Sequence, residues 1–218
     1  MPQNVEERFS QLGTATVSDA LDKLGLAGSL LGLGPLADGQ SMIGRAFTVR
    51  YISAGDPPGT VGDYIDDVQA GQVIVLDNAG RVDCTVWGDI LTAVAHKREI
   101  AGTVIDGVCR DTRRALTSGY PIYSCGRFMR TGKDRVEVAE VQAAVTIGGV
   151  KVQPGDLILG DSDGAVAIPQ DHEERVLAIA ESIHEREERI LAAALGGATI
   201  AHAREQFGYH HLQRKEAP

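Results

Sequence analysis

The chain has 218 residues, of which 43% are hydrophobic and 23% charged, the composition of an ordinary globular protein. Its formal net charge of −9 at pH 7 excludes sequence-independent nucleic-acid binding, because such binding requires a basic face. No apolar run approaches the length of a membrane span and the start, MPQNVEERFS, is too polar for a signal peptide, so we expect no membrane partner.

The first elements in chain order are a helix and a strand. The segment TATVSDALDKLG, residues 14–25, predicts a helix because its apolar residues recur at helical spacing. We expect Thr16 to cap the start of this helix and Gly25 to end it. After a glycine-rich loop, IGRAFTVRYIS at residues 43–53 alternates as the two faces of a strand do.

The middle of the chain contains three buried strands and one clear helix. Residues 63–72 predict a short helix or turn before the strand VIVLDN at 73–78, which ends at a turn formed by Asn-Ala-Gly. ILTAVAHKREI at residues 90–100 predicts a helix, since cations in its last turn suit the helix dipole. The strands GTVIDG and YPIYS follow at residues 102–107 and 120–124.

The last third predicts short strands and then a long helix. Residues 143–169 predict three strands separated by glycine and proline turns, and a helix begins at about residue 171, with Asp171 as its cap. The expected core positions of this helix are Val176, Leu177, Ile179, Ala180, Ile183 and Ile190. Because no linker or low-complexity tract divides the chain, we expect residues 1–218 to form a single domain.

Residues 87–91, WGDIL, are the first candidate for a binding site. If the helix begins here, its first backbone N–H groups lack partners within the helix and can bind an anion, and Gly88 lets a ligand approach the backbone. The alternative is that Asp89 simply caps the helix that it starts.

The second candidate is the end of the strand VIDGVCRD, where the chain turns to present Arg110 and Asp111. Arginine offers a planar pair of donors that matches a carboxylate or an α-keto acid. Asp111 could hold a hard cation, Mg²⁺ with several waters retained. The alternative is a surface ion pair between Arg110 and Asp111 that contributes little to stability.

Other polar residues give weaker indications. The stretch GRFMRTGKDRVEV carries four cations and is either a solvated loop or a basic lip that attracts an anionic substrate: Arg127, Arg130, Lys133 and Arg135. Cys84, Cys109 and Cys125 lack CxxC spacing, so we expect reduced thiols in a cytoplasmic protein and no zinc site. The histidines form no metal-ligand motif, and no nucleophile elbow, Walker or dinucleotide motif occurs.

Seven segments in order resemble those of the RraA-like family, which includes 4-hydroxy-4-methyl-2-oxoglutarate / 4-carboxy-4-hydroxy-2-oxoadipate aldolases and the regulator of ribonuclease E activity A. They are TVSDALDKLG, IGRAFTVRY, GQVIVLDNAG, WGDIL, GTVIDGVCRD, YPIYS and GVKVQPGDLILGDSDGAVAIP. The resemblance implies an α/β swivelling-domain-like fold, a layered β/β/α sandwich, in a cytoplasmic homotrimer or homohexamer with sites at subunit boundaries.

The resemblance also implies residue roles. The matching aldolase residues contact the substrate, partly through backbone N–H groups, at Gly88, Asp89, Ile90 and Leu91. Arg110 matches the residue that binds the pyruvyl group, Asp111 the ligand of Mg²⁺ or Mn²⁺, and Asp89 an acid that orients a metal-bound water. A glutamate of the neighbouring subunit's last helix, Glu185 or Glu188, would assist.

One position departs from the aldolase pattern. The aldolases carry an Asp or Glu three residues after the metal-binding aspartate, where this chain has Arg114. A cation there would either weaken metal binding or recognise a second acidic group on a different substrate, and Arg114 shares a face with Arg110 only if the segment is helical. We therefore expect a metal-dependent lyase that cleaves a 4-hydroxy-2-oxo diacid to pyruvate or decarboxylates oxaloacetate, an α-keto acid. The alternative is a non-catalytic regulator of a ribonuclease.

Overall fold

The computed structural model describes residues 4–209, which contact one another as two compact units. One unit is Gly28–Gln170, and the other consists of the described residues before and after it, 4–27 and 171–209. The expectation of a single domain over 1–218 stays a prediction. No described helix is long and apolar enough to cross a membrane.

The larger unit is built on an eight-stranded sheet with a parallel centre. The strand order is β1-β5-β4-β3-β2-β9-β10, and β6 also pairs with β2. Strands β2 to β5 are parallel to one another, while β1, β6, β9 and β10 are antiparallel to their neighbours. The bounds are β1 Gly34–Pro35, β2 Met42–Ser53, β3 Val73–Thr85, β4 Gly102–Cys109, β5 Ile122–Arg127, β6 Val136–Val141, β9 Leu157–Asp161 and β10 Gly164–Ile168.

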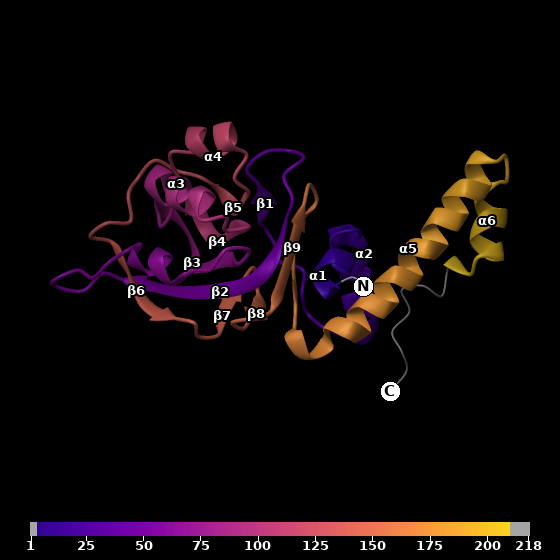
Figure 1. Ribbon diagram of the computed structural model, residues 1–218, viewed down its shortest axis with the longest axis horizontal. Coiled ribbons are helices and arrows are strands. Elements are labelled where there is room, and N and C mark those ends of the chain that lie inside the picture. Colours follow the sequence, from indigo (N-terminus) through magenta and orange to yellow (C-terminus); the bar gives the residue numbers. More distant parts are fainter. Residues whose placement is uncertain (1–3, 210–218) are drawn as a thin grey trace. The chain divides into compact units, whose positions relative to one another are not determined.

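Two apolar clusters separate this sheet from the layers on its two faces. Helices α3 (Asp89–Lys97) and α4 (Arg113–Ser118), with the 3-10 helix η1 (Asp63–Asp67), cover one face. The hairpin of β7 (Val145–Ile147) and β8 (Val150–Val152) covers the other (Figure 1). Side chains alternate between the two clusters along β3, which is the period-two pattern of a strand buried on both faces. These layers confirm the predicted α/β, β/β/α architecture.

The smaller unit contains four helices. They are α1 Val5–Phe9, α2 Thr14–Leu24, α5 Glu173–Leu195 and α6 Ile200–Gln206. Gly25 ends α2 with φ of 69°, as predicted, because glycine adopts the left-handed conformation without a steric penalty. The predicted caps were wrong: α2 begins at Thr14 after Gly13, ahead of Thr16, and Asp171 lies in the 3-10 turn before α5.

Several boundaries differ from the prediction. Strand β3 continues to Thr85, and the predicted Asn-Ala-Gly turn is an irregularity within it, with positive φ at Ala79 and Gly80. Residues 143–169 form four strands rather than three. Strand β6 was not predicted from the sequence, because it is stabilised by pairing with β2, which is distant in the chain. In the last helix five of the six expected core residues are buried, and Ile179 is half-buried.

Candidate active site

The predicted site residues lie where neighbouring parallel strands end. Gly88 and helix α3 follow β3, Arg110 and Asp111 follow β4, and residues 128–133 follow β5. The carboxyl ends of parallel strands meet at one edge of a sheet, where ligands of open α/β sheets commonly bind. The topology therefore brings together segments that are about twenty residues apart in sequence.

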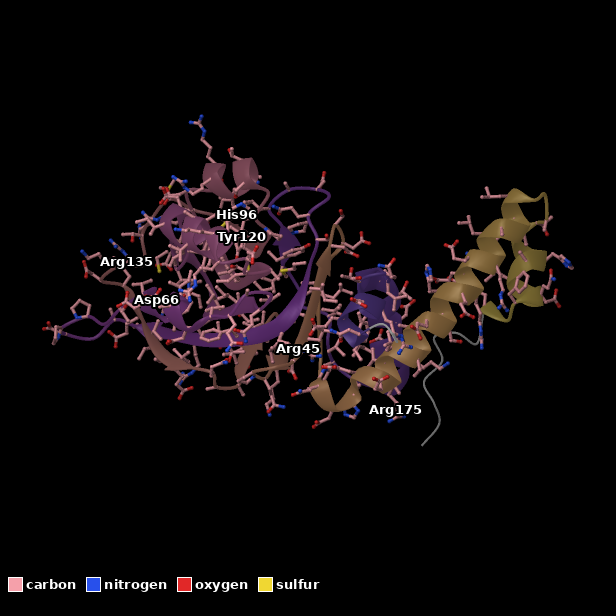
Figure 2. All side chains as sticks on the ribbon, viewed as in Figure 1. Arg45, Asp66, His96, Tyr120, Arg135 and Arg175 are labelled. Atoms are coloured by element: carbon pink, nitrogen blue, oxygen red, sulfur yellow. The ribbon has the colours of Figure 1, made fainter. Side chains whose placement is uncertain are left out.

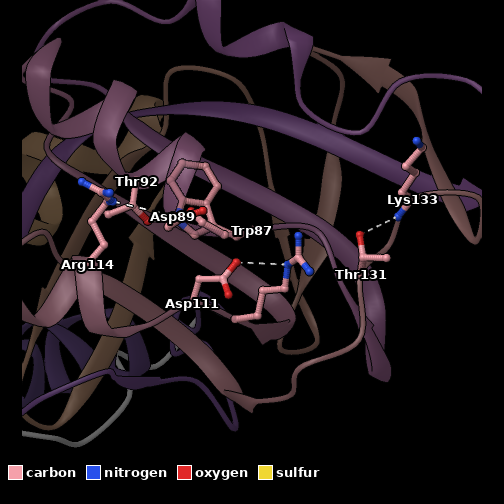
Figure 3. A network of polar contacts seen from close by, with 9 residues as sticks. Trp87, Asp89, Thr92, Asp111, Arg114, Thr131 and Lys133 are labelled. Carbon is pink, nitrogen blue, oxygen red and sulfur yellow. Dashed lines mark hydrogen bonds and ion pairs between the residues drawn. The ribbon is translucent and has the colours of Figure 1, made fainter.

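Buried hydrogen bonds fix the turn before α3. The indole Nε1–H of Trp87 donates to Thr92 Oγ1 at 2.9 Å, and the Thr92 hydroxyl donates to the carbonyl oxygen of Gly88 at 2.9 Å. Trp87, labelled beside Thr92 in Figure 3, also stacks on Tyr120, which is labelled in Figure 2, with 6.2 Å between ring centroids. Burial raises the pKa of the Tyr120 hydroxyl, which is hydrogen-bonded to Thr103 Oγ1. The position of Gly88 is thus set by the core.

Gly88 is the N-cap of α3, and Asp89 is the first helical residue. Asp89 is therefore not the cap, which was the alternative to a binding role. A Cβ at Gly88 would lie 3.0 Å from Asp111 Oδ2, closer than most real Cβ contacts. The backbone of Gly88 is extended, so glycine is favoured here by this close approach and not by its φ.

Arg110 and Asp111 form a half-exposed ion pair, with 3.3 Å between Arg110 Nε and Asp111 Oδ2. Asp111 has φ of 54°, in the left-handed region where aspartate and asparagine are enriched among non-glycine residues. The surface ion pair that was the alternative to a binding site is thus present. It also lies beside Gly88, as the binding hypothesis requires.

Arg114 faces the site. Its segment is helical, in α4, and its Nε lies 3.8 Å from Asp89 Oδ2 (Figure 3). The amide N–H of Arg114 donates to the carbonyl oxygen of Asp111 at 3.3 Å. The guanidinium of Arg114 therefore stands next to the Asp89 carboxylate, while its backbone bonds to that of Asp111.

Two pockets adjoin along these residues. One, of about 240 Å³, is lined by all four residues 88–91 together with Arg110. The other, of about 500 Å³, is lined by Asp89 and Asp111 and by α4 residues. Asp89 borders both pockets, so the two hollows are neighbours at the predicted residues.

Sequence reasoning missed part of the smaller pocket. Val61, Gly62 and Thr131 also line it, and no sequence pattern indicated them. Lys133 lines it too, as the basic lip hypothesis predicted. The other cations of that stretch contact protein groups. Arg127 donates to the Leu36 carbonyl oxygen, Arg130 lies over the Phe128 ring, and Arg135 donates to the carbonyl oxygens of Thr131 and Lys133.

The acidic side chains near the pockets determine which ligands a metal ion could have. No group of three or more His, Cys, Asp or Glu able to hold a metal occurs among residues 4–209. Asp89 and Asp111 are the acids that line the larger pocket. One or two carboxylates with water and substrate oxygens suit Mg²⁺, which rarely occupies an all-protein cage. Glu185 and Glu188 belong to α5 of the other unit, and Glu185 lies 3.7 Å from Arg189.

Comparisons with known proteins agree on one family. A family model described as RraA-like, Aldolase/RraA, matches residues 14–167. A Halalkalibacterium halodurans protein provisionally named 4-hydroxy-4-methyl-2-oxoglutarate aldolase is 35% identical, over 78% of this chain and 79% of the relative. The crystal structure of an uncharacterized protein from Pseudomonas syringae pv. tomato DC3000 is similar, with a TM-score of 0.86 and 42% identity over 92% of this chain and 96% of that chain.

A further relative is much longer than this chain. Protein DlpA of Legionella pneumophila is 39% identical over 94% of this chain, but the match covers only 34% of DlpA. The chain therefore spans about a third of that relative, and the similarity concerns one part of DlpA.

Proposed function

This chain belongs to the RraA-like family, and we propose that it is a divalent-metal-dependent lyase that releases pyruvate from a 4-hydroxy-2-oxo diacid, from oxaloacetate, or from both. One observation carries the proposal: the start of α3 and Arg110 line one pocket, and Asp111 lies directly beside Gly88. Aldolases named among the relatives support the reaction class.

The substrate carboxylate is proposed to bind at the start of α3. Backbone N–H groups in the first helical turn have no partners within the helix, and the helix dipole favours an anion there. Arg110 adds a guanidinium that matches a carboxylate with two parallel hydrogen bonds. Ile90 and Leu91 supply the apolar wall of the same pocket.

Asp111 is the proposed ligand for Mg²⁺ or Mn²⁺. Its carboxylate is half-exposed at the pocket, and Gly88 leaves room beside it that any Cβ would fill. A divalent cation bound there would act as a Lewis acid on the substrate's carboxylate and 2-oxo oxygens.

The protein's own groups would handle the charge and the proton. In the retro-aldol reaction the C3–C4 bond breaks, its electron pair enters the pyruvate enolate, and the C4 hydroxyl loses its proton as C4 becomes a carbonyl. Asp89, which borders both pockets, is the proposed acceptor of that proton, and Arg110 stabilises the charge of the enolate. A proton added at C3 then gives pyruvate. Decarboxylation of oxaloacetate forms the same enolate with loss of CO₂.

The assembly follows from the family resemblance. We propose a homotrimer or homohexamer in which Glu185 or Glu188 of a neighbouring copy approaches the site. Ile90, 75% exposed at the pocket, supports a covering copy, because a large apolar side chain is favoured when buried.

The family description also names RraA, so a protein-binding regulator of a ribonuclease is the second candidate. Arg114 favours it, since a cation beside Asp89 opposes binding of a second cation at the same site.

The test is pyruvate release, measured with lactate dehydrogenase and NADH, from 4-hydroxy-4-methyl-2-oxoglutarate and from oxaloacetate in the presence of Mg²⁺. We expect release from at least one substrate above the uncatalysed rate. No release by folded protein, together with inhibition of a ribonuclease, would replace the lyase with the regulator.

A further inference from the structure

The larger pocket contains two arginines that the proposed reaction does not use. Arg113 and Arg114 line it together with Thr117 and Ser118 of the same helix. Its volume, about 500 Å³, exceeds that of the pocket lined by Arg110, and Asp89 borders both pockets. The neighbouring pocket beside α4 is thus close to a substrate bound at Arg110, with Asp89 between the two.

The charges around this space do not balance. Asp111 is paired with Arg110, and Arg114 lies beside Asp89 with 3.8 Å between Nε and Oδ2, a distance too long for a hydrogen bond. The guanidinium of Arg113 has no hydrogen-bond or ion-pair partner in the part of the chain that the structure describes. Three arginines against two carboxylates leave a surplus positive charge that an anion would neutralise.

We propose that this pocket binds the distal carboxylate of the substrate, with Arg114 and Arg113 as the residues that select a diacid over a monoacid. The inference rests on the proposed function and names its substrate class more closely. The ion pair of Arg114 with Asp89, at 3.8 Å, is longer than a hydrogen bond, so the guanidinium can still donate two parallel hydrogen bonds to a carboxylate.

The contact between Arg114 and the distal carboxylate favours retro-aldol cleavage over decarboxylation. In retro-aldol cleavage of 4-hydroxy-4-methyl-2-oxoglutarate the distal carboxylate stays on the second pyruvate, so its ion pair persists through the reaction. In oxaloacetate the distal carboxylate itself leaves as neutral CO₂, and an arginine that holds its charge stabilises the ground state more than the transition state. The pocket therefore favours cleavage over decarboxylation.

A binding measurement tests the inference without requiring turnover. The probes are 2-oxoglutarate and 2-oxopentanoate, which have the same chain length but differ in a terminal carboxylate or methyl group. By calorimetry with Mg²⁺ present, we expect the protein to prefer 2-oxoglutarate, and Arg114→Gln to reduce that preference by about tenfold or more. Arg113→Gln should reduce it less, since Arg113 lines the pocket without an ion pair to Asp89, which Arg114 has.

Arg50→Gln is the matched control. Arg50 pairs with Glu140 at 3.0 Å on β2 and β6 and lines neither pocket, so the preference should stay at the wild-type value. Equal binding of the two probes by the wild type, or an unchanged preference in Arg114→Gln, would overturn the inference. In the turnover assay, Arg114→Gln should raise the ratio of decarboxylation to cleavage. Absence of any pyruvate release would overturn the proposed function while the binding result still decides the role of Arg114.

Discussion

The amide N–H of Arg110 donates to the carbonyl oxygen of Trp87 at 3.0 Å. This bond joins the end of β4 to the turn that precedes α3, two segments separated by a whole helix and strand. It places Gly88 against the side chains of Arg110 and Asp111, and so holds the proposed substrate grip next to the proposed metal ligand.

Gly88→Ala should reduce kcat/KM for pyruvate release by about tenfold or more, because the new Cβ would displace the Asp111 carboxylate from 3.0 Å. Thermal stability should change little, since Asp111 is half-exposed and its side chain can rotate away. Gly34→Ala is the control, because a Cβ at Gly34 meets nothing within 4 Å. A Gly88→Ala enzyme with wild-type kcat/KM would contradict the tight junction.

Thr92→Val should lower the free energy of unfolding by about 1–3 kcal/mol, because it leaves the buried Trp87 Nε1–H without an acceptor. Thr92→Ser retains the hydroxyl and serves as the control. Urea denaturation measures both variants. If valine and serine have the same effect, the hydrogen bond from Trp87 does not fix the turn.

Asp106→Asn should change the pH dependence of stability. Burial, and then the charge of Asp77, raise the pKa of Asp106 from its ordinary value of 3.8. The native state therefore binds the proton more tightly than the unfolded state, and this contribution is lost as pH rises through the raised pKa. Relative to the wild type, the variant should become more stable between about pH 4 and pH 7, as measured by urea denaturation at each pH.

Glu140→Gln should change the pH dependence of stability in the opposite direction, as measured in the same experiment. The hydrogen bond and charge of Arg50 lower the pKa of Glu140, so this residue stabilises the fold above its ordinary pKa and ceases to do so in acid. Its variant should be less stable than the wild type at pH 7 and match it at low pH. Parallel pH profiles for Asp106→Asn and Glu140→Gln would contradict both assignments.

The sequence predicts the parts of this site that depend on local pattern. Buried strands, the glycine that begins α3 and the Arg110-Asp111 turn are all readable from short segments, and parallel strand ends meet at one edge. Strand β6 and the pocket residues Val61 and Thr131 could not be found this way, because distant pairing places them. Helix α4 has only six residues and no periodic signal, so the sequence did not predict which way Arg114 faces.

The most direct test of the account is pyruvate release as a function of Mg²⁺ concentration, for the wild type and for Asp111→Asn. Asparagine keeps the size of the side chain and tolerates the positive φ at this position, so the variant should fold while losing the charge that holds the cation. We predict saturable, EDTA-sensitive release by the wild type and at least a hundredfold loss, on the order of 3 kcal/mol of transition-state stabilisation, in the variant. Equal release by both proteins, or release unaffected by EDTA, would contradict a metal-dependent lyase centred on Asp111.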